Sequence, residues 1–350
     1  MLVALWYTVN IALVIANKWL ISTTGFKSTN LLTLFHMITS TLASGALVAG
    51  GVVPWKPLTL PLMGKVAVLS GSFTLSVATC MASLAYLPAS FVQALGSTTP
   101  AFTAILAFLF QGRREARVTY AACLPVVAGI ALASGGEPLF NGLGLALQLV
   151  ACASRSFKTV LQAVLLTDDR ERFHPMTLLA VTSALSALSL VPLVAVTEPG
   201  GIKQVLELHL LHPRTFGPLL ALSCGCAYLA NWTNFIISKR LGALTLQVLG
   251  NFKNVVAAAM ALAVFGNPVT AMGLLGYAIT TAGVFTYSHL VAKFPAHRVP
   301  APLGWLIGLG PAPPRQVGIM PDTDTAAAMG SRKSLSAALV DEERAPLLRA

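Results

Sequence analysis

The sequence predicts an all-α membrane protein of ten transmembrane helices, arranged as two inverted five-helix repeats. Of the 350 residues, 55% are hydrophobic and only 10% are charged, whereas soluble domains carry about 25% charged residues. The apolar residues form stretches of about 20, the length that crosses a bilayer as a helix. The second half of the chain also matches the first at a fixed offset of 154 residues, which indicates an internal duplication.

Ten stretches have the length and apolar character of a membrane-spanning helix. They are expected at residues 2–22, 30–50, 66–86, 89–111, 118–135, 142–165, 175–197, 217–238, 243–265 and 268–288. Most connections between them are short and rich in turn-forming residues, as in Gly135-Gly136-Glu137-Pro138. The longest connection, 198–216, contains an apolar patch that we expect to lie along the membrane surface.

The distribution of Lys and Arg predicts the orientation of the helices. Nine of these residues lie in the loops after the second, fourth, sixth and eighth helices, against three in the loops after the odd-numbered helices. Because cytosolic loops carry the excess of positive charge, we expect the even-numbered loops and both termini in the cytosol. The net charge of +11 does not indicate nucleic-acid binding, since the basic residues occur singly or in small groups without interleaved aromatic residues.

The two ends of the chain bear on targeting. The first predicted helix begins almost at Met1, with no basic, Ser-rich leader of the kind that forms an organellar transit peptide. Either the protein enters the secretory membranes through this helix, or the sequence lacks its true start. Residues 294–350 are rich in Pro, Ala and Gly and are expected to form a disordered cytosolic tail. There, Glu343, Leu347 and Leu348 match an acidic dileucine sorting signal, a pattern that also arises by chance.

The internal match pairs the fourth and fifth predicted helices with the ninth and tenth. The matched pairs include Gln93/Gln247, Leu95/Leu249, Gly96/Gly250, Gly112/Gly266 and Gly129/Gly283. The duplication implies two halves, 1–135 and 142–290, of five spans each. Because an odd number of spans turns the second half upside down, we expect inverted repeats with the substrate site at the midplane between them.

The predicted helices contain cations without matching anions. Lys18, Arg155, Lys158 and Lys253 are firmly cationic and His36 is titratable, while no Asp or Glu falls within the ten helices. A charge at the centre of a helix costs roughly 3 kcal/mol on insertion scales, so such residues persist where they face an interior that pairs them. We therefore expect an anionic substrate to supply the countercharge.

Polar residues on several helices are expected to line one cavity. Arg155 and Lys158 share a face of the sixth helix, since residues three or four apart align. Lys18 lies near a helix end, where a long side chain also extends to the membrane surface, and hydroxyl and amide groups also serve simply to join neighbouring helices. The candidate substrate-binding residues are Lys18, Gln93, Thr98, Thr99, Arg155, Lys158, Tyr228, Asn231, Gln247, Asn251, Lys253 and Asn254.

These residues also constrain the mechanism. Proton-coupled carriers need a titratable relay within the membrane, and only His36 lies deep enough, so coupling to protons or sodium is not expected. An empty site would leave several cations facing one another, which favours strict exchange of one anion for another. We find neither an intramembrane acid nor a His-Cys-Glu cluster, which a membrane-embedded enzyme would need, and we expect no cofactor or metal. An enzyme and an anion channel are the rival interpretations.

Five motifs, in this order, resemble the triose-phosphate translocator and nucleotide-sugar transporter family, within the drug/metabolite transporter superfamily. The motifs are Asn17-Lys18-Trp19-Leu20, Gly96-Ser97-Thr98-Thr99-Pro100, Gly135-Gly136-Glu137-Pro138, Ser156-Phe157-Lys158-Thr159-Val160-Leu161-Gln162 and Thr245-Leu246-Gln247-Val248-Leu249-Gly250-Asn251-Phe252-Lys253. The resemblance covers residues 6–290 or nearly so. It implies the same ten-helix inverted-repeat fold and an antiport mechanism.

The resemblance also implies a phosphorylated cargo. Plastid members exchange sugar phosphates for phosphate, and endomembrane members exchange nucleotide sugars for nucleoside monophosphates. Plastid members hold phosphate with a Lys-Arg pair in the ninth helix, where this chain has Lys253 followed by Asn254, and their histidine in the fourth helix falls near Gln93. These departures make the chain most similar to the plant and algal endomembrane branch.

We therefore expect an antiporter of the Golgi or another endomembrane. It would exchange a phosphorylated sugar or nucleotide sugar for phosphate or a nucleoside monophosphate, with a plastid-type sugar-phosphate/phosphate translocator as the alternative. A homodimer is compatible with the small residues Gly273, Gly276 and Gly283 in the last helix, which permit close helix packing.

Overall fold

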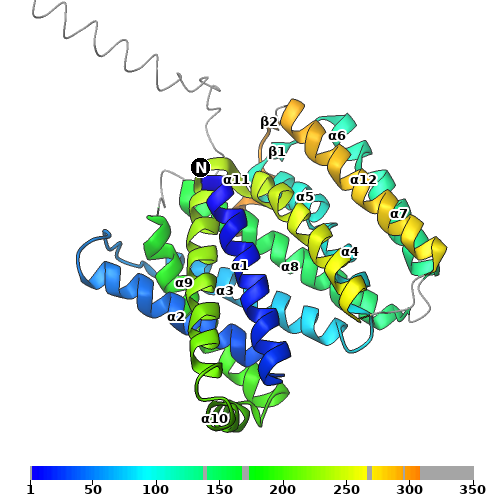
Figure 1. Cartoon of the computed structure of the whole chain (residues 1–350). Coiled ribbons are helices and arrows are strands. Elements are labelled where there is room, and N and C mark those ends of the chain that lie inside the picture. The colour runs from blue at the N-terminus through cyan, green and yellow to red at the C-terminus, as the bar shows by residue number, and fades with distance from the viewer. Residues whose placement is uncertain (1, 137–139, 168–172, 266–269, 295, 308–350) are drawn as a thin grey trace, which may run out of the picture. The chain divides into compact units, whose positions relative to one another are not determined.

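The computed structural model describes residues 2–136, 140–167, 173–265, 270–294 and 296–307, and all structural statements below concern these residues (Figure 1). The side chains of Gln93 and of residues 251–265 are among those not described within these ranges. The elements in chain order are α1 (Leu2–Thr24), α2 (Thr29–Ala49), α3 (Leu60–Ser83), α4 (Ala89–Gly96), α5 (Thr99–Gln111), β1 (Arg113–Arg114), α6 (Arg117–Ala121), α7 (Cys123–Gly136), α8 (Gly142–Thr167), α9 (Pro175–Thr197), α10 (Gly201–Leu211), α11 (Phe216–Phe265), α12 (Ala271–Lys293), β2 (His297–Arg298) and a 3₁₀ turn (Gly304–Ile307).

Eight helical stretches of the described chain are long and apolar enough to cross a membrane. They lie in α1, α2, α3, α4–α5, α6–α7, α8, α9 and the first part of α11. Large apolar side chains are exposed on these helices, for example Leu124, Leu188 and Val196, as expected where lipid replaces water as the solvent. The prediction of an all-helical membrane protein with many spans is therefore confirmed.

Two of the expected helices are interrupted. The helix expected at 89–111 is divided into α4 and α5, because Pro100 has no N–H to donate to the Gly96 carbonyl four residues earlier. The Thr99 hydroxyl donates to that carbonyl at 2.6 Å instead. In the same way, Pro125 cannot donate to Ala121, the last residue of α6, and α7 begins two residues later. Both stretches are still long and apolar enough to cross a membrane, with a break shortly before the proline.

The expected helices 217–238 and 243–265 meet at a single residue. Gly242 has φ 84° and ψ 171° inside α11, so the chain bends there and continues as a helix. Glycine adopts this backbone conformation readily because it has no Cβ. The loop expected at 239–242 is thus reduced to one kink, and we call the parts before and after it α11a (216–241) and α11b (243–265).

Helices α7 and α12 cross at very short range. A Cβ on Gly129 would lie 2.5 Å from the Thr280 backbone nitrogen, and a Cβ on Gly283 would lie 2.9 Å from that of Val126. The contacts run antiparallel, and Gly276 similarly meets Ala133. The glycines that were compatible with a homodimer, Gly276 and Gly283, are therefore used for packing within the chain.

A short sheet joins the loop after α5 to the segment after α12. Strand β1 pairs with β2 in antiparallel fashion, so that Arg113 lies opposite Arg298, and the Val299 amide donates to the Gly112 carbonyl at 2.8 Å. Gly112 has φ +63°, and any Cβ there would collide with the Val299 carbonyl oxygen. The tail expected to be disordered from residue 294 thus begins with defined structure at 296–307. The expected sorting residues Glu343, Leu347 and Leu348 lie outside the described residues.

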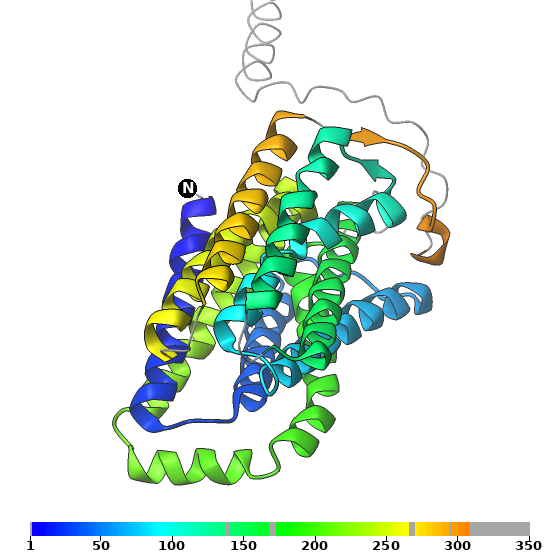
Figure 2. The same ribbon diagram turned by 90° about the vertical axis from the view of Figure 1, so that its right-hand side faces the viewer.

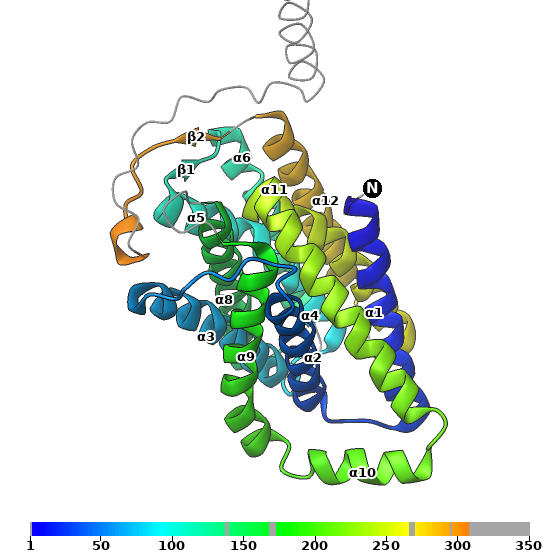
Figure 3. The same cartoon turned by 90° about the vertical axis from the view of Figure 1, so that its left-hand side faces the viewer.

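The segment between α9 and α11 is helical at its centre and lies across one end of the bundle (Figures 2 and 3). This helix, α10, is at the end opposite the start of α1 and the end of α12. Glu198, just before α10, accepts hydrogen bonds at 2.8 and 2.9 Å from the backbone amides of Asn30 and Leu31 in the first turn of α2. Gln204 accepts a further bond from the Ser28 hydroxyl at 2.9 Å. These contacts tie α10 to the α1–α2 connection.

Candidate functional site

The site is organised around Lys158 on α8. This helix packs against α3, α4, α5 and α11, which places its central residues in the interior of the bundle. The Lys158 ammonium lies 5.3 Å from the centre of the Phe73 ring. No described carboxylate lies within ion-pairing distance of Lys158 or of Arg155. Arg155 is one turn earlier on the same helix, close enough for the two like charges to repel.

Lys158 lines a small cavity enclosed by five helices. Its volume is about 20 Å³, room for about one water molecule. Ligand pockets for small organic molecules usually measure about 300–1,000 Å³, so the cavity is too small to hold such a molecule in this conformation. The lining residues are Met37 of α2, Phe73 of α3, Lys158 of α8, Leu179, Thr182, Ser183 and Ser186 of α9, and Asn231 and Phe235 of α11a.

Asn231 is the second predicted residue that the structure brings to this cavity. Its amide nitrogen donates to the Ser40 hydroxyl at 3.4 Å, and Ser40 in turn donates to the His36 carbonyl at 2.8 Å. Asn231 thereby holds α11a against α2. Its carbonyl oxygen takes no part in that hydrogen bond, so the side chain retains an acceptor at the cavity wall.

Gln247 connects α11b to the same face of α8. Its amide nitrogen donates to the Thr159 hydroxyl at 2.8 Å, and Thr159 donates to the Arg155 carbonyl at 2.8 Å. Gln247 is thus one residue away from Lys158 and one helical turn from Arg155. The structure therefore brings Lys158 and Asn231 to one cavity, while Gln247 is joined through Thr159 to the Arg155 backbone on the adjoining part of α8.

His36 belongs to a neutral hydrogen-bond chain beside this region. The Ser223 hydroxyl donates to the Asn17 side-chain oxygen and lies 2.8 Å from His36 Nε2. Because Ser223 uses its only proton on Asn17, Nε2 must be the donor to Ser223. This chain joins α1, α2 and α11a.

Several predicted residues have other surroundings. The Thr98 and Thr99 hydroxyls are buried and donate to the Leu95 and Gly96 carbonyls at 2.8 and 2.6 Å, which stabilises the break between α4 and α5. Tyr228 packs against an apolar cluster, and Lys18 is exposed on α1. The side chains of Gln93, Asn251, Lys253 and Asn254 lie outside the described residues.

Three hydroxyl-bearing residues of α9 at the cavity were not predicted. Thr182, Ser183 and Ser186 line it, yet α9 is so apolar that its hydroxyls pass for ordinary helix contacts. The signal available in the sequence for Thr182 and Ser186 was their spacing of four residues, which puts both on one helix face.

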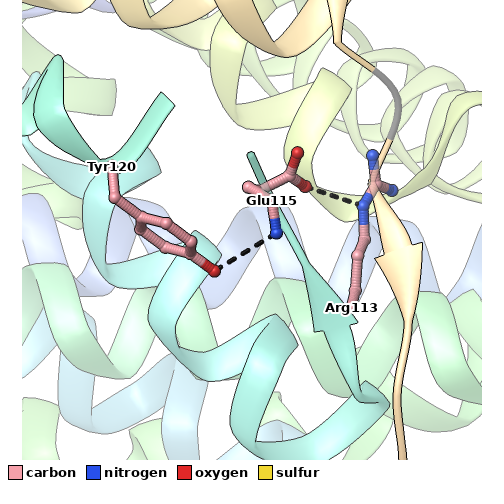
Figure 4. A network of polar contacts seen from close by, with 3 residues as sticks. All are labelled: Arg113, Glu115 and Tyr120. Carbon is pink, nitrogen blue, oxygen red and sulfur yellow. Dashed lines mark hydrogen bonds and ion pairs between the residues drawn. The ribbon is translucent and has the colours of Figure 1, made fainter. Parts of the chain in front are cut away.

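A second polar cluster lies in the loop after α5 and not at the cavity (Figure 4). The Arg113 guanidinium donates to the Glu115 carboxylate at 3.0 Å, and the Tyr120 hydroxyl lies 3.3 Å from the Glu115 amide, which donates to it. Burial raises the pKa of the Glu115 carboxyl above its ordinary value near 4.5, and the neighbouring Arg113 charge opposes that rise. Near the start of α9, burial and the Lys239 charge lower the pKa of His174 below 6.5.

The described interior provides groups that can bind an anion. Within the part of the chain that the structure describes, no three His, Cys, Asp or Glu residues come together as a potential metal site. The interior contains Lys158 and Arg155, with hydroxyl and amide groups around them. Such a set can hold a charged oxygen-rich molecule through charge-assisted hydrogen bonds.

Comparison with known proteins identifies the chain. Residues 1–288 match the model of the Triose-phosphate Transporter family. The chain belongs to this family. The resemblance inferred from its five motifs is therefore confirmed.

Relatives within the family are transporters of phosphorylated sugars. A probable sugar phosphate/phosphate translocator of Arabidopsis thaliana is 42% identical over 295 residues, which cover 84% of this chain and 83% of the relative. UDP-uronic acid transporter 1 of the same plant is also 42% identical over 295 residues, with 84% and 95% covered. UDP-galactose transporter 1 of Arabidopsis thaliana is 29% identical over 291 residues, with 81% and 84% covered.

Proposed function

We propose that this protein is a secondary antiporter that exchanges a phosphorylated sugar or nucleotide sugar for phosphate or a nucleoside monophosphate. The observation that carries the proposal is the position of Lys158, which faces a cavity between five helices with no described carboxylate to pair it. Lys158 is half-buried, and a charge held away from water without a partner is costly. A phosphate group entering this cavity would supply the missing negative charge, and Arg155 would add a second cationic contact.

Exchange follows from the same imbalance. When the cavity is empty, the repulsion between Arg155 and Lys158 is not offset by any described anion. The conformational change that returns the site across the membrane therefore has a lower barrier with an anion bound than without one. Obligatory exchange of one anion for another is the expected consequence.

For the architecture, we infer two inverted repeats of five spans, 1–135 and 142–290. The crossing of α7 and α12 supports this inference, because it is antiparallel and its glycine contacts, at 126–129 and 280–283, are 154 residues apart. This is the offset at which the two halves of the sequence match. Helices related by a two-fold axis in the membrane plane would cross in this manner. The repeat also places Lys253 and Asn254 in the half opposite α4.

The membrane we propose is the Golgi or another endomembrane, with both termini in the cytosol. The UDP-uronic acid and UDP-galactose transporters among the relatives favour a nucleotide sugar as cargo, and a sugar phosphate is the second candidate, favoured by the probable sugar phosphate/phosphate translocator. The replacement of the plastid-type Lys-Arg pair by Lys253-Asn254 weakens the case for a small cargo that is mostly phosphate.

A liposome exchange screen tests the proposal. Purified protein would be reconstituted into vesicles preloaded with phosphate, UMP, GMP or no anion, and uptake of labelled UDP-glucuronic acid, UDP-galactose, GDP-mannose and triose phosphate would be measured. We expect uptake of at least one labelled compound, dependent on a preloaded counter-anion, and its loss in the Lys253→Ala variant although that variant still inserts. Equal uptake into empty and preloaded vesicles would rule out obligatory exchange.

A further inference from the structure

Two hydroxyl groups on α9 lack partners although they are buried. Thr182 is 5% exposed and Ser186 1% exposed, and neither side-chain oxygen has a hydrogen-bond partner among the described residues. Both residues line the cavity that Lys158 enters. They lie one helical turn apart, so their side chains are on the same face of α9.

Their neighbours on α9 behave differently. The Ser183 hydroxyl donates to the Leu179 carbonyl at 2.6 Å and the Ser189 hydroxyl donates to the Leu185 carbonyl at 2.7 Å, the usual way in which a helix absorbs a hydroxyl group. Thr182 and Ser186 make no such bond. They are therefore not explained by the internal bonding of the helix, nor by a contact with a neighbouring described helix.

Burying a hydroxyl without a partner is destabilising, and buried polar groups are almost always paired in stable proteins. In a site that binds a polar molecule, the bound ligand supplies the missing hydrogen-bond partner. The two hydroxyls are neutral and accept as well as donate, which suits the hydroxyl groups of a sugar. The charge needed for phosphate is supplied from α8 by Lys158.

We propose that Thr182 and Ser186 are specificity-determining residues that bind the hydroxyl groups of the sugar moiety, while Lys158 holds the phosphate. The cavity then has a cationic wall on α8 and a neutral hydroxyl wall on α9, and Asn231 of α11a lines the same cavity. This inference rests on the proposed antiport function. It adds that α8 binds the phosphate group whereas α9 binds the transferred sugar, so that α9 distinguishes the sugar compound from a counter-substrate that lacks this sugar.

The experiment compares the two directions of exchange in reconstituted vesicles. Thr182→Val and Ser186→Ala remove one hydroxyl each with little change in volume, and Ser189→Ala is the matched control on the same helix. The probes are UDP-glucuronic acid and UDP-galactose against UMP, and triose phosphate against inorganic phosphate. We expect KM for the transported sugar compound to rise about fivefold in each cavity variant, the effect of one neutral hydrogen bond. We expect KM for UMP or phosphate to be unchanged, and Ser189→Ala to change neither.

Thermal unfolding without substrate provides a second measurement. Removing an unpaired buried hydroxyl should leave the Tm unchanged or raise it, whereas removing a hydroxyl with a structural partner should lower it. An equal rise of KM for the sugar compounds and for UMP or phosphate, no change in either, or a lowered Tm would overturn the inference while leaving the antiport function intact. If the unsubstituted protein exchanges none of the probes, the proposed function fails and this inference fails with it.

Discussion

Replacing Lys158 with methionine separates a binding charge from a structural one. Methionine has nearly the length of the lysine side chain and fills the same space without the charge. If Lys158 holds phosphate, Lys158→Met removes a charge-assisted hydrogen bond worth about 1.5–3 kcal/mol, which corresponds to roughly a 10- to 150-fold loss of apparent substrate affinity. The loss should be seen for both exchanged anions, because both carry phosphate.

The same substitution should not destabilise the protein. A charge inside the membrane costs roughly 3 kcal/mol, whereas the contact of the ammonium with the Phe73 ring, at 5.3 Å, returns about 0.5–2 kcal/mol. The methionine sulfur regains about 0.3–1.5 kcal/mol against that ring. The balance favours the variant by about 2 kcal/mol, so its Tm in the absence of substrate should rise.

The assay is anion exchange in vesicles together with thermal unfolding of the same preparations. Lys56→Met is the matched control. Lys56 belongs to the connection between α2 and α3, its ammonium lies 5.0 Å from the centre of the Phe173 ring, and it does not line the cavity. The control should keep its exchange activity. A Lys158→Met protein with unaltered KM values, or one that loses activity only because it unfolds, would refute the reasoning.

Four further substitutions test the packing and the loops. Gly129→Ala places a Cβ 2.5 Å from a backbone nitrogen of α12 and should cost about 1–3 kcal/mol of stability. The control Gly71→Ala, in α3, places a Cβ with nothing within 4 Å and should stabilise the protein by up to about 1 kcal/mol. Thermal unfolding of both variants tests this, and equal Tm changes would contradict the close crossing of α7 and α12. Glu198→Ala leaves two amides of the first turn of α2 without their acceptor and should cost about 1–2 kcal/mol of stability. The amides at the start of α2 should then exchange their hydrogens with solvent faster, and an unchanged rate of hydrogen exchange would count against the contact. Because burial raises the pKa of Glu115, its contribution to stability is full below its ordinary pKa and is lost as the pH rises through the raised value. Glu115→Gln should therefore gain Tm relative to the unsubstituted protein as the pH rises above the ordinary carboxyl value near 4.5, and a constant difference would show that its pKa is not raised.

Much of the architecture follows from local properties of the chain. The expected helices at 30–50, 142–165 and 175–197 agree with α2, α8 and α9 to within a few residues, because the length of an apolar stretch is visible without knowing its neighbours. Proline marked the place where α4 ends, since the missing N–H acts on a carbonyl only four residues away. The kink at Gly242 was harder to predict, because a glycine within a turn-like stretch does not show that a helix continues on both sides of it.

The candidate site was only partly predictable. Arg155, Lys158, Asn231 and Gln247 were expected from charge and polarity, and of these Lys158 and Asn231 line one cavity. Thr98 and Thr99 were also expected there, yet their hydroxyls are bonded to carbonyls of their own helix break. A hydroxyl can be satisfied within its own turn, whereas a lysine ammonium needs a partner from elsewhere, so charge is a stronger predictor of a site than polarity.

The amino-acid sequence by itself determined that this is a helical membrane protein of the triose-phosphate transporter family, with cations in its interior and no acids to match them. These are properties of composition, segment length and motif order. Only the tertiary structure decided which side chains share the cavity with Lys158, and it added Thr182 and Ser186 from α9. The reason is that helix rotation and packing, which bring residues far apart in the chain to a common wall, depend on contacts summed over the whole bundle.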